Sequence, residues 1–117
     1  MKIETAKLRE EMLRNVVTDL VLWIEKNINK KITAKDVVSK SGYSEFYLQR
    51  AFAAQRGETI SRYIRRRKLE LAASMLSEGE NEIIDISLKL GFNDVSTFYR
   101  SFRRKFGVTP RRYITIK

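Results

Sequence analysis

The amino-acid sequence predicts an all-α protein of seven helices, arranged as two helix-turn-helix subdomains joined by a long linker helix. Three observations lead to this prediction. The 117 residues include one proline and five glycines, so few helix breakers interrupt the chain. Apolar side chains recur at three- and four-residue steps, which is the spacing of an amphipathic helix. A pattern of caps, glycines and aromatic residues occurs twice, once in each half.

The first three helices are expected at about residues 7–28, 34–40 and 45–55. An apolar stripe marks the first of them: Leu13, Val17, Leu20, Ile24 and Ile28. Thr33 and Ser44 are the expected N-caps of the next two helices, because a hydroxyl accepts a hydrogen bond from an otherwise free N–H of the first turn.

The fourth helix is expected to follow the cap Thr59 and to end near Leu76. A polar segment, Ser77–Asn81, is the expected hinge. The predicted domain division is therefore an N-terminal subdomain (1–58), a linker helix (59–77) and a C-terminal subdomain (78–117).

The last three helices complete the C-terminal subdomain. The fifth is expected at about residues 83–90, and the sixth at about 94–106 with Asn93 as its cap. The seventh is expected to begin at Thr109–Pro110, because proline is favoured in the first turn of a helix.

An internal repeat relates residues 36–64 to residues 85–114, with one extra residue in the second copy. The matched pairs are Asp36 and Asp85, Lys40 and Lys89, Gly42 and Gly91, Tyr43 and Phe92, Ser44 and Asn93, Leu48 and Phe98, Arg50 and Arg100, Phe52 and Phe102, Gly57 and Gly107, Thr59 and Thr109, and Tyr63 and Tyr113. Each copy follows the plan of a helix-turn-helix unit. A generic helical hairpin is the alternative interpretation.

The net charge of +10 indicates a polyanionic partner. One cluster of cations lies in the linker helix: Arg62, Arg65, Arg66, Arg67 and Lys68. A second lies near the end of the chain: Arg100, Arg103, Arg104, Lys105, Arg111 and Arg112. Such clusters favour nucleic acid over a membrane surface. The alternative is a basic surface that serves only solubility.

The composition excludes several classes of function. Cysteine and histidine are both absent, which removes disulfides, zinc fingers and imidazole chemistry. No phosphate-binding Gly-Lys-Ser/Thr loop occurs, and Glu78, Glu80 and Glu82 are those of an ordinary polar loop. No apolar run approaches the ~18 residues of a membrane span, and residues 1–14 lack a signal-peptide pattern. We therefore expect a cytoplasmic protein that is no enzyme and has no cofactor, metal or membrane partner.

The outward face of the third helix is suited to reading DNA bases. Gln49 and Arg50 are the side-chain types that pair bidentately with adenine and guanine edges. Phe46 lies on the same side, where it is either a contact for a thymine methyl group or an extra core residue.

The sixth helix has a core face and a basic outward face. Its aromatic stripe is expected in the core: Phe98, Phe102 and Phe106. On the other side, Arg100 is the candidate for base contact, while Arg103 and Arg104 are candidates for phosphate contact. Tyr99 is expected to contact bases or backbone, or simply to cover the lobe. Asp94 is expected to stabilise the N-terminus of the helix.

Three strings carry a resemblance to a known family. They are G-Y-S-E-F-Y-L-Q-R-A-F (Gly42–Phe52), R-R-R-K-L-E-L-A-A-S-M-L (Arg65–Leu76) and G-F-N-D-V-S-T-F-Y-R-S-F-R-R-K-F-G-V-T-P-R-R-Y (Gly91–Tyr113). On these strings the chain resembles the AraC/XylS family of bacterial transcription regulators over about residues 10–114. Its size and the segment Trp23–Asn27 are most similar to the short single-domain MarA/SoxS/Rob subgroup.

The resemblance implies a monomer that binds an asymmetric site on double-stranded DNA, with two recognition helices in successive major grooves. It also implies activation through contact with RNA polymerase. The expected base contacts are Phe46, Gln49, Arg50, Val95, Ser96, Tyr99 and Arg100. The expected contacts to the DNA backbone are Ser44, Tyr47, Arg62, Arg66, Arg103, Arg104, Thr109 and Arg111.

The second copy departs from the family pattern. Glutamines that relatives carry near Val95 and Ser96 are missing, and Ile114 replaces a common arginine. We therefore expect unequal partners, with the first unit reading bases and the second anchoring on the backbone. Larger members of the family add an effector domain, so this chain is either controlled by its abundance or part of a longer protein. A nonspecific architectural or RNA-binding protein and a protein-interaction adaptor are the alternative functions.

Overall fold

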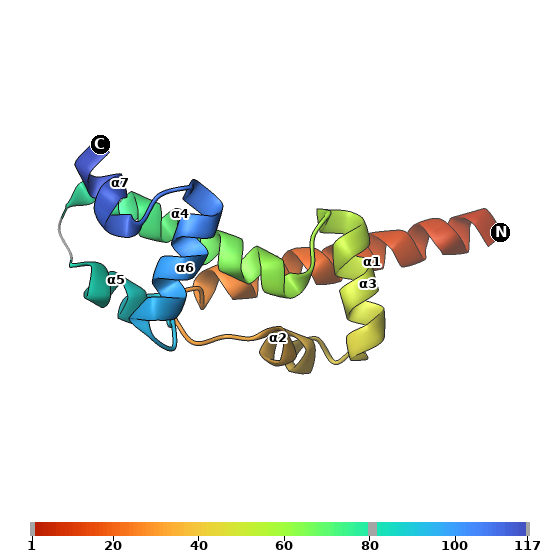
Figure 1. Ribbon diagram of the computed structural model, residues 1–117. Coiled ribbons are helices and arrows are strands. Elements are labelled where there is room, and N and C mark those ends of the chain that lie inside the picture. The colour runs from red at the N-terminus through yellow and green to blue at the C-terminus, as the bar shows by residue number, and fades with distance from the viewer. Residues whose placement is uncertain (1, 80–81, 117) are drawn as a thin grey trace. The chain divides into compact units, whose positions relative to one another are not determined.

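The computed structural model describes residues 2–79 and 82–116, and over these residues it contains seven α-helices and no β-strand (Figure 1). The all-α prediction is confirmed. The helices are α1 (Lys2–Lys26), α2 (Ala34–Ser41), α3 (Glu45–Arg56), α4 (Ile60–Glu78), α5 (Ile83–Lys89), α6 (Val95–Phe106) and α7 (Pro110–Ile116).

The chain divides into two compact units. Unit 1 comprises Met1–Asn27 and Ile32–Tyr63, and unit 2 comprises Ile28–Lys31 and Ile64–Lys117. The boundary passes through α4, so the linker helix contributes to both units.

The core of unit 1 is formed by one face of α1 packed on α2, α3 and the first turn of α4. Its fully or nearly buried side chains are Val17, Leu20, Ile24, Val37, Leu48, Ala51, Phe52, Ile60 and Tyr63. The Tyr63 hydroxyl donates a hydrogen bond of 2.7 Å to the Glu25 carboxylate, which links α4 to α1 within this unit. Trp23, which is adjacent in sequence to the buried Ile24, is only half-buried.

The core of unit 2 is aromatic. Its buried cluster contains Leu69, Ala72, Ala73, Leu76, Ile86, Leu90, Phe98 and Phe102. The phenylalanines that recur every four residues on α6 contact each other in series, with ring centroids 5.7 Å apart for Phe98 and Phe102 and 4.5 Å apart for Phe102 and Phe106. The prediction that this stripe lies in the core is confirmed for Phe98 and Phe102, and Phe106 is half-buried against them.

The structure corrects three helix boundaries. α1 begins at Lys2 rather than at residue 7, because its first turns are rich in strong helix formers although residues 4–12 are exposed. α4 continues through Ser77 and Glu78, which were assigned to the hinge; the remainder of that hinge, residues 80 and 81, lies outside the described residues. The N-cap of α6 is Asp94 rather than Asn93.

The internal repeat is confirmed in three dimensions. Gly57 and Gly107 end α3 and α6 in the left-handed conformation, at φ of 75° and 79°. The caps Thr59 and Thr109 accept hydrogen bonds from the third residue after each, with N–O distances of 3.1 and 3.2 Å. The pairs Phe52–Tyr63 and Phe102–Tyr113 also meet edge to face, at 5.8 and 5.4 Å. Each unit is therefore a helix-turn-helix closed by a capped third helix.

Candidate nucleic-acid interface

The outward face of α3 is open to solvent, as the sequence predicts. The Ser44 hydroxyl caps this helix by accepting a hydrogen bond from the N–H of Tyr47, at 3.3 Å. On the outward face, Phe46 is 72% exposed, and the Arg50 guanidinium lies 5.4 Å from the centre of the Phe46 ring. The interpretation of Phe46 as a core residue is therefore wrong. Gln49 is half-buried beside them.

Tyr47 lies at the edge of this face. Its ring is 41% exposed and stacks on Tyr43, with centroids 5.5 Å apart and the planes 19° apart. The stack holds the Tyr47 ring beside the N-terminus of α3. A phenol at this position can donate a hydrogen bond to a phosphate oxygen.

The N-terminus of α6 is capped by Asp94. The Asp94 carboxylate accepts hydrogen bonds from the backbone N–H of Thr97 at 2.7 Å and from its hydroxyl at 3.1 Å. These bonds, with a smaller contribution from the Arg100 charge, lower the pKa of the Asp94 carboxyl below its ordinary value. The expected role of Asp94 in stabilising the helix is confirmed.

The outward face of α6 is less open than that of α3. Arg100 and Ser96 are exposed, whereas Val95 and Tyr99 are half-buried. Tyr99 packs against the aromatic core, with its ring edge-on to Phe98 at 6.3 Å. Of the roles considered for Tyr99, this geometry favours covering the core.

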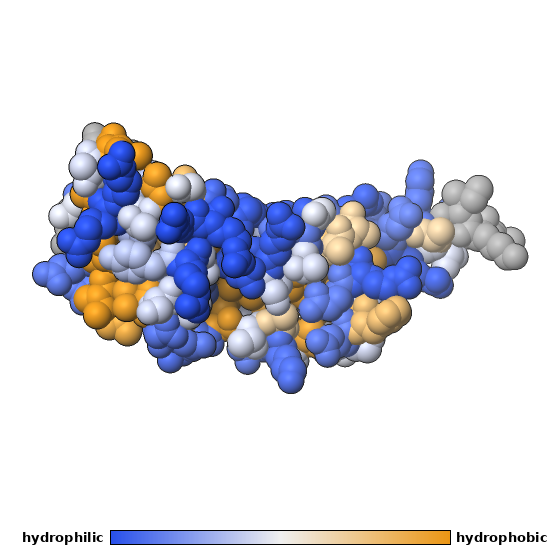
Figure 2. Space-filling view, viewed as in Figure 1, coloured by the Kyte–Doolittle hydropathy of each residue, from blue (hydrophilic) through white to orange (hydrophobic). Residues whose placement is uncertain are grey.

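The residues expected to contact the DNA backbone differ in their exposure to solvent and in the contacts that they already make. Four are exposed arginines: Arg62, Arg103, Arg104 and Arg111. Thr109 is half-buried and caps α7 through its hydroxyl. Figure 2 shows strongly hydrophilic residues over α6 and an apolar area over α5, where Ile84 and Leu88 are exposed.

Arg66 is held by an acidic neighbour. Its guanidinium contacts the Glu70 carboxylate at 3.0 Å, and that of Arg67 contacts the same carboxylate at 2.7 Å. The hydrogen bond from Arg67, and after it that from Arg66, lowers the pKa of the Glu70 carboxyl. A phosphate contact by Arg66 therefore has to compete with Glu70.

The linker cluster of cations is smaller than the sequence indicates, because Lys68 is buried. Its side chain is 6% exposed, and its ammonium donates hydrogen bonds to the backbone carbonyl oxygens of Lys30, at 2.7 Å, and Leu90. Lys68 lies between Ile64 and Ala72 at four-residue steps on the apolar face of α4. This register is the sequence signal that could have placed it inside.

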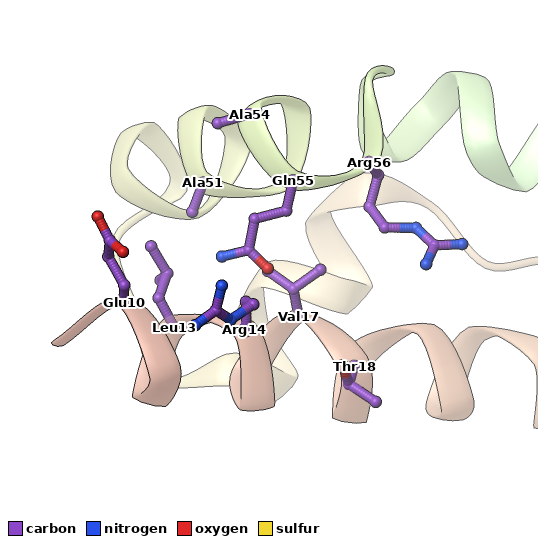
Figure 3. A pocket seen from close by; sticks show the side chains of 9 residues that line it. All are labelled: Glu10, Leu13, Arg14, Val17, Thr18, Ala51, Ala54, Gln55 and Arg56. Atoms are coloured by element: carbon purple, nitrogen blue, oxygen red, sulfur yellow. The ribbon is translucent and has the colours of Figure 1, made fainter. Parts of the chain in front are cut away.

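A groove of about 580 Å³ lies between α1 and α3 in unit 1 (Figure 3). Its lining on α3 includes Ala51, Ala54 and Gln55, and Gln55 reaches from α3 toward α1. Glu10 is the single carboxylate among the lining residues, so the groove lacks the carboxylate pair that general acid–base chemistry would need in a chain without histidine.

Across 2–79 and 82–116, acidic side chains do not form a cluster of three or more that could hold a metal ion. Within those same ranges, none of the helices combines the length and apolar character needed to cross a membrane.

A family described as a helix-turn-helix domain matches residues 37–115, which is more than half of the chain. Over 100 residues the chain is 42% identical to the regulatory protein SoxS of Escherichia coli K12, covering 86% of this chain and 94% of SoxS. It is 39% identical over 104 residues to the probable transcription factor PqrA of Proteus vulgaris, covering 87% and 85% of the two chains.

The chain belongs to the AraC/XylS family. Solved structures agree. An AraC-type DNA-binding regulator from Chromobacterium violaceum matches with a TM-score of 0.78 at 27% identity, over 87% of this chain and 91% of that one. The DNA-binding domain of AdpA, solved with a target DNA, matches in fold with a TM-score of 0.82 at 16% identity, over 86% and 90%. This AraC/XylS member is a DNA-binding transcription regulator rather than an enzyme.

Proposed function

We propose that this protein is a transcription activator that binds an asymmetric site on double-stranded DNA with α3 and α6 as its reading helices. The single observation that carries the proposal is the outward face of α3. There an exposed Phe46 and the Arg50 guanidinium above it stand beside Gln49, on a helix that buries Leu48, Ala51 and Phe52 on its other face. An exposed phenylalanine beside a glutamine and an arginine matches the apolar and bidentate contacts that read base edges in the major groove.

In the first unit, Gln49 and Arg50 make bidentate contacts to base edges in the major groove, and Phe46 contacts a thymine methyl group. The stacking of Arg50 over Phe46 orients the guanidinium before DNA arrives, which reduces the conformational entropy that binding must remove. Ser44 and Tyr47 contact the phosphates that flank the groove, beside the N–H groups at the start of α3.

In the second unit, Arg100 and Ser96 are the reading side chains, with smaller contributions from Val95 and Tyr99. The half-burial of Val95 and Tyr99 supports this ranking. The remaining contacts go to the DNA backbone and are made by Arg62 of unit 1 and by five residues of unit 2: Arg66, Arg103, Arg104, Thr109 and Arg111. The second unit then contributes more electrostatic affinity than sequence discrimination.

A binding selection on random duplex DNA tests the proposal. We expect an enriched, non-palindromic motif with two blocks whose centres are about 10 base pairs apart, the repeat of the major groove on one face of the duplex. Electrophoretic titration of the selected duplex then gives the stoichiometry, and we expect one protein chain per site. Failure to enrich any motif would contradict sequence-specific binding.

The net charge of +10 favours a second candidate, nonspecific binding to nucleic acid. The same selection separates the two, because a nonspecific protein retains DNA in a strongly salt-dependent way without enriching a motif. A duplex RNA of matched length serves as the competitor. Stronger retention of RNA than of the selected DNA would favour the second candidate.

Activation through RNA polymerase is proposed from the relatives, whose names describe regulators and a transcription factor. Transcription in vitro from a promoter that carries the selected motif, with bacterial RNA polymerase, is expected to rise when the protein is added. A fall would indicate repression. In the cell this activity belongs in the cytoplasm, where the bacterial chromosome lies.

A further inference from the structure

The buried ammonium of Lys68 joins two stretches of backbone in unit 2. Its two acceptors are the carbonyl of Lys30, in the segment Ile28–Lys31 that belongs to this unit, and the carbonyl of Leu90, at the C-cap of α5. The contacts span 38 and 22 residues of sequence. One side chain of α4 therefore holds the turn of the second helix-turn-helix against a distant segment.

The charge of Lys68 has a cost in stability. Burial penalises the charged ammonium and lowers the pKa of Lys68 to about 8. A methionine or leucine would fill the same space without that penalty. What a charged side chain adds is direction, because each N–H requires an acceptor at a defined place.

The backbone at this junction is in close contact. A Cβ atom on Gly91 would lie 2.7 Å from the carbonyl carbon and oxygen of Lys30 and 2.8 Å from the nitrogen of Lys31. Three residues, Gly91–Asn93, then lead to the Asp94 cap of α6. Phe92, within that stretch, packs on Phe98 of α6 at 5.1 Å. A shift at Leu90 is therefore passed to the start of α6.

The equivalent turn in unit 1 has no such support. Gly42 corresponds to Gly91, and a Cβ atom there would meet no described atom within 4 Å beyond its own neighbours. That turn is held locally, since the Ser41 hydroxyl donates to the carbonyl of Val38 and accepts from the N–H of Tyr43. Leu90 replaces Ser41 in the second copy and has no hydroxyl.

We propose that Lys68 is a positioning residue for DNA recognition by unit 2: bonded to the carbonyls of Lys30 and Leu90, it sets the direction in which α6 presents Ser96 and Arg100. The inference rests on the proposed function, because it assumes that α6 reads bases. It concerns a residue that does not itself contact DNA.

The test compares the wild type with Lys68→Met on three duplexes: the selected site, the site with the half read by α3 scrambled, and the site with the half read by α6 scrambled. Arg50→Ala identifies the α3 half, because it relaxes the base preference only there. Lys68→Met is expected to weaken binding to the intact site about tenfold. It should weaken binding equally when the α3 half is scrambled, and hardly at all when the α6 half is scrambled.

Lys7→Met is the matched control, since it removes one exposed cation from α1 and should leave the discrimination between duplexes unchanged. Equal losses on all three duplexes, or no loss on the intact site, would overturn the inference for Lys68. A wild type that binds all three duplexes alike would instead overturn the proposed function.

A measurement on the wild type keeps the inference testable if Lys68→Met does not fold. Thermodynamic coupling is reciprocal. If the hydrogen bonds of Lys68 strengthen the binding of α6 to DNA, then the binding of α6 to DNA strengthens those hydrogen bonds. The ammonium protons of Lys68, followed by NMR, should exchange with water more slowly on the intact duplex than on the duplex with a scrambled α6 half. Equal exchange rates on the two duplexes would contradict a positioning role.

Discussion

The two helix-turn-helix units share a scaffold but hold their turns in different ways. In unit 1 the turn between α2 and α3 is stabilised by Ser41, a neighbour in sequence, and its glycine stands in open space. In unit 2 the turn between α5 and α6 is stabilised by Lys68, and its glycine lies directly against the backbone of Lys30 and Lys31. The first turn is held by contacts within a few residues of sequence, and the second is held by contacts with distant parts of the chain.

This difference matches the difference between the reading faces. The first face combines an exposed aromatic ring, a stacked guanidinium and an amide, and needs only its own helix to present them. The second offers one exposed arginine and one serine among half-buried neighbours, next to a run of cations. The two copies of this repeat thus keep their caps and core while they differ in the side chains on their outward faces and in the contacts that hold their turns.

The largest expected effect is the loss of stability on replacing Gly42 or Gly91, the glycines of the two turns, by alanine. Alanine at either position has to adopt a left-handed backbone, which costs about 1–2 kcal/mol. Gly91→Ala also forces the backbone of Lys30 and Lys31 to move, which adds roughly 1–3 kcal/mol by analogy with overpacking. Urea unfolding monitored by circular dichroism measures both variants. Equal losses would show that the second turn is as free as the first.

The pH dependence of stability measures the effect of burying the Lys68 ammonium. Burial lowers its pKa from 10.5 to about 8, so between these pH values the unfolded chain binds one proton more than the folded chain. The free energy of unfolding should therefore rise as the pH increases from 8 to 10.5, by at most about 3 kcal/mol. Lys68→Met should lack this gain, and the difference between the two proteins cancels the titration of other groups. Parallel curves would contradict the assignment.

The reading residues provide the next comparison. Arg50→Ala should weaken binding to the selected site by about 1–3 kcal/mol and relax the preference at one base pair. Arg100→Ala should relax the base preference less, because we propose that unit 2 binds mainly through the DNA backbone. Competition titrations against single-base variants of the site measure both effects. A larger relaxation for Arg100→Ala would reverse the ranking of the two units.

The smallest expected effect concerns phosphate contacts. Arg104→Ala should weaken binding to all duplexes alike and reduce the slope of log K against log salt by about one. Arg66→Ala should reduce it less, since Glu70 already holds that guanidinium. Titrations at several salt concentrations give both slopes. Equal reductions would mean that Arg66 leaves Glu70 when DNA binds.

The sequence by itself determined the helices, the repeat and the outward-facing residues of α3. These features depend on near neighbours: caps lie within three residues of the N–H groups that they bind, and a helical face follows from a 3.6-residue period. The turns at Gly42–Ser44 and Gly91–Asn93 could therefore be predicted from the sequence. The cap of α6 was missed by one residue, because Asn93 and Asp94 are both strong capping residues and the extra residue of the second copy falls at that point.

Only the tertiary structure decided which cations are available. Lys68 belongs by sequence to a basic cluster, yet its ammonium is buried between carbonyls 38 and 22 residues away. Arg66 and Arg67 converge on Glu70, and Tyr99 turns toward the aromatic core. Helical periodicity predicts the face of a helix from which a side chain projects, but not the group that the side chain contacts. The two carbonyl partners of Lys68 are brought to it by folding from distant parts of the chain, whereas the pairs that Arg66 and Arg67 form with Glu70 lie within four residues of one helix.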